Sequence, residues 1–230
     1  MTMDVLRLSE RIVWGLQGIL RCMTKDNMSL VEKYAETNLP TRHGLFKVTV
    51  FRDQAGVEHL AIHKGDIAGG ELVVARVHSE CFTAEVLGSL KCDCREQLEM
   101  ALDAIQAAGR GVVVYLRQEG RGIGLGNKIR AYALQEAGAD TIQANVQLGF
   151  AVDARRYDLA AAILQKLGVR SVALMTNNPD KCEQLAAAGV IVAKRVAIEA
   201  PANEFSLGYL QTKRDKMGHM LDAAPLVVPA

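Results

Sequence analysis

The 230-residue sequence is poor in aromatic residues, which make up 5% of the chain with a single Trp, and it has only five prolines. It contains no uninterrupted apolar run of about 18 residues, and this argues against a membrane-spanning helix. The charges balance, with 27 Lys and Arg against 26 Asp and Glu, so no positive excess points to generic nucleic-acid binding. With 50% hydrophobic and 23% charged residues, the composition is that of a folded globular protein.

Cysteine is also scarce, and its distribution is uneven. The five cysteines are Cys22, Cys81, Cys92, Cys94 and Cys182. Glu10 and Arg11 interrupt the N-terminal segment before the apolar core of a signal peptide can form. An odd cysteine count without such a signal favours a reducing, cytoplasmic location over a disulfide framework. Three of the five thiols fall within fourteen residues, which is the first functional clue.

Hydrophobic periodicity predicts an α/β fold of the mixed α+β kind, with a strand-rich N-terminal half and helices packed on a mixed sheet. Predicted strands cover residues 46–52, 57–63, 72–78, 111–116, 171–175 and 190–196. Predicted helices cover residues 95–108, 128–137, 158–167 and 179–188. Apolar residues spaced by three and four predict a further helix from residue 1 to about 34. From residue 201 onward the chain is expected to be loop-like.

The three clustered cysteines have the spacing C-x10-C-x-C, which suits a metal ion. Thiolates bind Zn²⁺ tightly, and three protein ligands leave a fourth position for water, as in catalytic zinc sites. Two other interpretations stay open at this point. The thiols could be small buried hydrophobic groups, or His78 could complete a structural site of four ligands.

Three polar segments could bind an anion. The segment 117–128 is rich in Gly and Arg and lies between a predicted strand and a predicted helix, where backbone N–H groups can approach a phosphate. Asp153 and Arg155 precede a helix, and residues 176–181 join a strand to a helix whose first position is Pro179. Taken singly, each segment is better explained as a plain turn, a helix cap or a solvated charge.

Taken together, these segments closely resemble GTP cyclohydrolase II, the zinc enzyme that opens the riboflavin pathway. The matching motifs occur in order between about residues 39 and 221: RVHSEC from Arg76, CDC from Cys92, RQEGR from Arg117, NKIRAY from Asn127 and TNNP from Thr176. The resemblance divides the chain into an N-terminal helical extension (1–38), a catalytic domain (39–221) and a flexible tail (222–230).

The resemblance implies hydrolysis of GTP with release of formate and pyrophosphate, giving 2,5-diamino-6-ribosylamino-4(3H)-pyrimidinone 5′-phosphate. It implies one Zn²⁺ per chain on Cys81, Cys92 and Cys94, and Mg²⁺ with the triphosphate. The implied GTP contacts are Arg76, Val77, His78, Ser79, Glu80, Gln97, Glu119, Gly120, Arg121, Thr141, Thr176 and Lys181. Gln97 and Glu119 are the candidates for recognising guanine.

The implied catalytic residues are Asp153 as general base, Tyr132 near the ring chemistry and Arg155 at the α-phosphate. Because a guanidinium stays protonated, we expect Arg155 to stabilise phosphate rather than to act as a covalent nucleophile. The resemblance also indicates a homodimer. A paralogue with another product and a non-catalytic nucleotide-binding regulator remain the alternatives.

Overall fold

A seven-stranded mixed sheet forms the centre of the computed structural model, which describes residues 27–151 and 153–221. The strands are β1 (Val31–Thr41), β2 (Gly44–Asp53), β3 (Glu58–Lys64), β4 (Val73–Ser79), β5 (Gly111–Leu116), β6 (Ser171–Met175) and β7 (Ile191–Val196). Their order in the sheet is β1-β2-β3-β5-β4-β6-β7. The pairs from β1 to β5 are antiparallel, and those from β5 to β7 are parallel.

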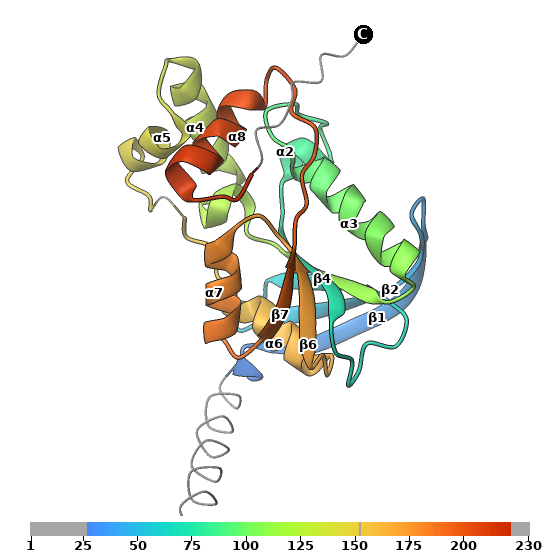
Figure 1. The fold of residues 1–230 in the computed structure, drawn as a ribbon. Coiled ribbons are helices and arrows are strands. Elements are labelled where there is room, and N and C mark those ends of the chain that lie inside the picture. Colours follow the sequence, from blue (N-terminus) through green and yellow to red (C-terminus); the bar gives the residue numbers. More distant parts are fainter. Residues whose placement is uncertain (1–26, 152, 222–230) are drawn as a thin grey trace, which may run out of the picture.

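Helices cover both faces of this sheet, and Figure 1 shows α3 on one side with α6 and α7 on the other. The helices are α2 (Phe82–Glu85), α3 (Cys94–Ala108), α4 (Leu125–Glu136), α5 (Thr141–Gln147), α6 (Asp158–Lys166), α7 (Pro179–Ala187) and α8 (Leu207–Met217), with a 3₁₀ turn η1 (Glu119–Gly122). The mixed α/β class predicted from periodicity is therefore confirmed. None of the helices in the described ranges is both long and apolar enough to cross a membrane.

The central strand β5 illustrates why the sequence folds in this way. Its run of β-branched residues, Val112 to Val114, is fully buried, as expected for a strand covered on both faces. On one face, Ala101 and Ile105 of α3 pack against it, and on the other lies the apolar stretch of α6. At Gly111 a Cβ atom would lie 2.6 Å from the carbonyl oxygen of Val74, so only glycine permits the two strands to approach this closely.

Two parts of the sequence prediction are wrong. Residues 31–38, assigned to the helical extension, belong to β1, which pairs with β2 along its whole length. Nine of the eleven residues of β1 are exposed, so this edge strand lacks the apolar alternation that marks a half-buried strand. The segment after residue 201, expected to be loop-like, contains α8. The rest of the predicted extension (1–26) and the predicted tail (222–230) lie outside the described residues.

Candidate active site

The predicted site residues gather at the point in the sheet where successive parallel strands are added on opposite sides of β4. From β4 the chain passes through α3 to β5 on one side, and later it returns through α6 to β6 on the other side of β4. Right-handed crossovers in opposite directions place α3 and α6 on opposite faces and leave a crevice at the carboxyl end of β4. Residues from the segments after β4, β5 and β6, which carry the motifs, line this crevice.

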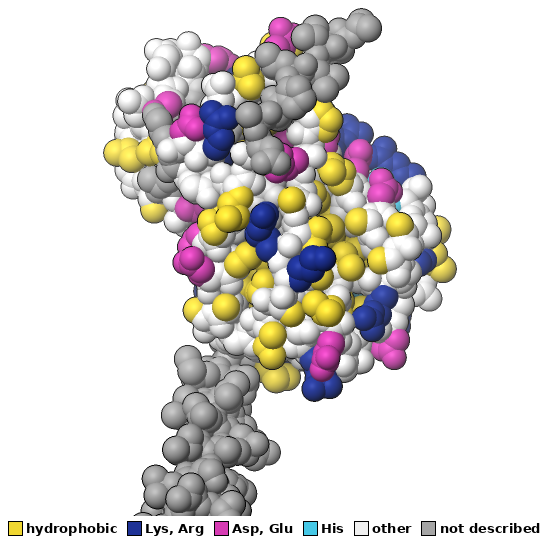
Figure 2. Space-filling model, viewed as in Figure 1, with side chains coloured by type: hydrophobic (Ala, Val, Ile, Leu, Met, Phe, Trp, Pro, Cys, Tyr) yellow, Lys and Arg dark blue, Asp and Glu magenta, His cyan; other side chains and the backbone are white. Residues whose placement is uncertain are grey.

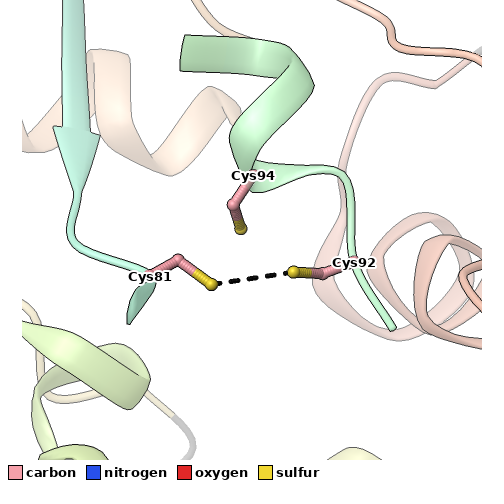
Figure 3. A group of neighbouring side chains, drawn as sticks. All are labelled: Cys81, Cys92 and Cys94. Atoms are coloured by element: carbon pink, nitrogen blue, oxygen red, sulfur yellow. Dashed lines mark hydrogen bonds between the residues drawn. The ribbon is translucent and has the colours of Figure 1, made fainter. Parts of the chain in front are cut away.

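The thiol cluster, made of Cys81, Cys92 and Cys94, lies at this crevice. Figure 3 shows Cys81 directly after β4, Cys92 in the loop before α3 and Cys94 at the start of α3, with the three sulfur atoms turned toward one another. All three Sγ atoms lie within 4.8 Å of one another, and those of Cys81 and Cys92 are 3.7 Å apart. Tetrahedral ligands about 2.3 Å from Zn²⁺ lie about 3.8 Å apart, so the donor set fits this ion.

The other two cysteines and His78 do not belong to the thiol cluster. Cys182 is a free thiol on α7, and Cys22 lies outside the described residues. The Nε2 atom of His78 lies 2.7 Å from a carboxylate oxygen of Glu85, which occupies this ring nitrogen. Within the described ranges the arrangement therefore offers three thiols, and the four-ligand interpretation that includes His78 receives no support.

Charged groups around the thiols favour a thiolate. Lys128 of α4 places Nζ 3.1 Å from Sγ of Cys81 and 2.8 Å from Oε1 of Glu119. Hydrogen bonding from Cys92 and the charge of Lys128 lower the pKa of Cys81. The interaction with Cys81 raises the pKa of Cys92 to about 11. Lys128 thus favours the thiolate form of Cys81, the form in which a cysteine binds a metal ion.

Backbone hydrogen bonds hold the loop that carries Cys81. The carboxylate of Glu85 accepts the N–H of Cys81 at 3.1 Å and the hydroxyl of Tyr115 at 2.6 Å. The carboxylate of Glu119 accepts the N–H of Phe82 at 2.6 Å. The sequence analysis did not identify Glu85 as a residue that holds this loop, because a single acidic residue on a four-residue helix has no distinctive spacing.

The Gly-rich segment after β5 forms a tight turn in an unusual backbone conformation. Gly120 and Arg121 have φ angles of +61° and +59°, and for Arg121 this left-handed conformation is strained. The terminal nitrogens NH1 and NH2 of Arg121 are buried and have no hydrogen-bond partner among the described residues. A buried guanidinium held in this way has its donors available for an anion.

Two cavities adjoin at this crevice. The larger, of about 470 Å³, contains the thiol cluster on its wall together with Lys128 and Tyr132. The smaller, of about 70 Å³, is the basic pocket, and its charged wall residues include Arg76, Lys181 and Lys213. Both are lined by Ser79, Cys94, Arg121, Arg155 and Tyr209. A single elongated ligand can therefore reach the thiols and the cations together.

The basic pocket contains more positive than negative charge. The carboxylates of Asp153 and Asp93 pair with Arg155 and Lys213. The remaining three cations, Arg76, Arg121 and Lys181, have no carboxylate partner among the described residues.

Burial makes these unpaired charges costly. Lys181 is 5% exposed, and its Nζ donates only to the carbonyl oxygen of Val77, at 2.9 Å. Burial, together with the charges of Arg76 and Arg155, lowers the pKa of Lys181 well below its ordinary value. Uncompensated buried cations are unfavourable, and a bound anion would offset their charge.

Asp153 and Arg155 form a close ion pair. Nε of Arg155 lies 2.9 and 3.0 Å from the two carboxylate oxygens of Asp153, and the guanidinium also donates through NH2. Although burial disfavours the ionised carboxyl, the hydrogen bonds and charge of Arg155 lower the pKa of Asp153. Arg155 lines both cavities, whereas Asp153 lines neither.

The remaining predicted contacts differ in how they face the crevice. Arg76, His78, Gln97 and Thr176 line the basic pocket, Glu80, Glu119, Gly120 and Tyr132 line the larger cavity, and Ser79 lines both. The side chain of Val77 is fully buried in the core, so this residue offers only its backbone. Thr141 is the first residue of α5, and its side chain lies outside the described part of the structure.

The two candidates for guanine recognition use their polar atoms within the protein. Gln97 bridges Arg76 and Asp93. The carboxylate of Glu119 accepts from Phe82, Gly120 and Lys128. Both side chains are thereby fixed at the wall of a cavity, and guanine recognition by them stays a prediction.

Converging thiols beside a pocket of unpaired cations, at the switch point of a parallel sheet, define an enzyme of the α/β class with sites for a metal ion and a polyanionic substrate. A family profile described as GTP cyclohydrolase II matches residues 32–197. The chain belongs to this family.

Two relatives support the assignment. The chain is 52% identical over 192 residues to a protein named GTP cyclohydrolase-2 from Neisseria meningitidis serogroup A, covering 84% of this chain and 98% of that protein. It is 53% identical over 193 residues to a probable monofunctional riboflavin biosynthesis protein, RIBA 3, chloroplastic, from Oryza sativa subsp. japonica. That match covers 83% of this chain and 36% of the rice protein, so this chain spans little more than a third of the rice protein's length.

Proposed function

We propose that this chain hydrolyses GTP in the first step of riboflavin biosynthesis, as its family does, and that the reaction takes place where the two cavities adjoin. The imidazole ring is opened at the thiol cluster with release of formate, and pyrophosphate is released at the basic pocket. The observation that carries this proposal is the shared wall: Cys94, Arg121 and Arg155 line both cavities. A nucleoside triphosphate has its base and its phosphates at opposite ends, as the two cavities require.

The thiol cluster would hold Zn²⁺, because three converging sulfur donors match the preference of this ion for thiolate ligands, and Lys128 favours the thiolate at Cys81. Zinc bound there supplies a water of lowered pKa and so a nucleophile for C8 at neutral pH. Lys128 offsets the charge of the thiolates and orients Cys81. Mg²⁺ would enter with the triphosphate, since this ion is commonly held through substrate phosphates rather than by a protein cage.

Tyr132 and Asp153 would handle protons. Burial raises the pKa of Tyr132 to about 12, so its hydroxyl stays protonated and can donate a hydrogen bond to developing negative charge. Asp153 is ionised at neutral pH, as a base must be, but its pairing with Arg155 makes it a weak one. When Arg155 binds phosphate, this pairing loosens and the carboxylate of Asp153 becomes a stronger base.

Arg155 would stabilise the α-phosphate. Burial opposes its charge, but the hydrogen bonds to Asp153 raise the pKa of Arg155 above its ordinary value. A guanidinium in this state is no nucleophile, and it binds phosphate oxygens through its planar pair of N–H donors.

The decisive experiment is incubation of the purified protein with GTP and Mg²⁺, with the products identified by mass. The family product, formate and pyrophosphate are expected in equal amounts. A different pyrimidine product would identify a paralogue, and binding without turnover would identify a regulator. ATP serves as the control, because it lacks the N2 amino group and N1–H of guanine and is expected to react at least about a hundredfold more slowly.

We also propose a homodimer in the cytoplasm. Figure 2 shows hydrophobic side chains spread over the face that β7 presents, and Ile191 on this edge strand is 64% exposed. Apolar surface of this kind favours association. Sedimentation at several protein concentrations would reveal the oligomeric state, and a monomer throughout would refute the dimer.

A further inference from the structure

The C-terminal helix α8 lies beyond residue 197, where the match to the family profile ends. It is a polar helix, and within its described residues Lys213 is the one buried side chain. The helix nevertheless forms part of the crevice, since Tyr209 lines both cavities and Lys213 lines the basic pocket. A helix without an apolar stripe needs other attachments to the body of the protein: Tyr209 packs against the buried cluster that contains Cys81 and Cys92, and Lys213 makes a buried ion pair.

Lys213 is attached to the residue between two of the thiols. Its Nζ lies 2.8 Å from Oδ1 of Asp93, which separates Cys92 from Cys94. The two side chains are 10% and 4% exposed. The second carboxylate oxygen of Asp93 accepts from Gln97 at 2.6 Å. This ion pair joins segments 120 residues apart in the sequence.

The position of Asp93 in the chain shows what the pair does. Asp93 is the residue before α3, where an aspartate normally accepts the free N–H groups of the first helical turn. Its side chain makes no such capping bond here. The carboxylate points instead to Lys213 and Gln97, and this orientation fixes the backbone between Cys92 and Cys94. Without the cation, a buried carboxylate would turn toward the helix end or toward water and move both thiols.

We propose that Lys213 is a positioning residue for the thiol cluster, holding the Cys92–Cys94 turn in place through Asp93 and making α8 a structural part of the metal site. The aromatic ring of Tyr209, 4.3 Å from Nζ of Lys213, adds a second favourable contact for the cation. The inference rests on the proposed role of the thiols as metal ligands.

The test measures zinc affinity of the purified protein by competition with a chromophoric chelator. Lys213→Met keeps the length of the side chain and removes its charge, and we expect it to weaken zinc binding about 10-fold to 100-fold, as loss of outer partners does at other metal sites. Lys213→Arg restores a cation and should recover most of this loss. Arg214→Met removes the neighbouring exposed charge of the same helix and should leave the affinity unchanged.

The Asp93→Asn variant separates positioning from general stability. If Lys213 acts through Asp93, adding Lys213→Met to the Asp93→Asn protein should cost little further zinc affinity. The double variant can also be measured if Lys213→Met alone fails to fold, because it leaves no unpaired charge buried at this position. Equal affinity of Lys213→Met and the wild type, or fully additive losses, would overturn the inference while leaving the proposed function intact. A wild-type protein that binds no zinc would overturn both.

Discussion

The thiol cluster and the basic pocket share wall residues but differ in how their charged groups are paired. At the thiols, one cation, Lys128, contacts Cys81 and is itself paired with Glu119. In the basic pocket, Arg76, Arg121 and Lys181 lack a carboxylate partner within the described ranges. The first region pairs its cation with a carboxylate, whereas the second holds three cations without one. On the proposed function, a metal ion would bind in the first region and a ligand with several negative charges in the second.

The largest effect is expected from a substitution that disrupts the thiol cluster and leaves the basic pocket intact. Cys92→Ser should abolish zinc binding and lower formate release by on the order of a thousandfold, because the nucleophile for C8 is lost. Some pyrophosphate release should persist, giving a guanosine monophosphate. Elemental analysis and separate assays of formate and pyrophosphate measure this. Cys182→Ser is the matched control, and undiminished formate release from a folded, zinc-free Cys92→Ser protein would contradict the role of the metal.

The converse substitution acts on the phosphate side. Arg155→Ala should lower pyrophosphate release about 100-fold to 1,000-fold, because a preorganised donor to the phosphate is lost. Zinc content should stay at about one per chain, since Arg155 is not bonded to a thiol. Arg156→Ala is the control, because Arg156 is exposed and pairs with Asp158 instead. Equal pyrophosphate release from both variants would contradict the proposed role of Arg155 at the phosphates.

A third substitution tests the effect of the unpaired cations in the basic pocket on GTP binding and on stability. Lys181→Met should raise KM for GTP about 10-fold to 100-fold, the value of a charge-assisted hydrogen bond. It should also raise the free energy of unfolding of the unliganded protein by about 1 kcal/mol, because an uncompensated buried cation is removed. Denaturant unfolding and steady-state kinetics test the two signs, with Lys166→Met, an exposed lysine, as the control. A less stable Lys181→Met protein with unchanged KM would show that the pocket is not strained by its charge.

The last prediction concerns pH. Burial lowers the pKa of His219 from 6.5 to about 3, and nearby cations reinforce the shift. Those cations are Lys213, Lys181, Arg155 and Arg121. As the pH falls below 6.5, the unfolded chain binds a proton at this histidine and the folded protein does not, so stability falls toward pH 3. His219→Asn should make that fall shallower by at most about 1.4 kcal/mol per pH unit. Identical slopes for both proteins in denaturant titrations at pH 4 to 7 would contradict a neutral His219.

Where the fold was predictable, the signal was local and apolar. The buried β-branched run of β5 and the helix that begins with Asn178 and Pro179 were predicted nearly residue for residue, because a strand period and a helix cap are written in a few neighbouring residues. The edge strand β1 was missed because its mostly exposed residues lack apolar alternation, and the polar helix α8 because its buried ion pair is made with a residue far away in the sequence. β1 pairs with β2 by backbone hydrogen bonds, and α8 is anchored by Lys213.

The sequence by itself determined the chemical parts of this protein: three closely spaced thiols, a Gly- and Arg-rich turn and a polar turn before α7. Their order was enough to indicate the GTP cyclohydrolase II family. Only the tertiary structure decided which parts meet, because a sheet brings together the ends of strands that are far apart in the chain. It turned Lys128 toward Cys81, set Arg155 against Asp153 and joined Lys213 to Asp93. These are long-range pairings or side-chain orientations, and no spacing along the chain encodes them.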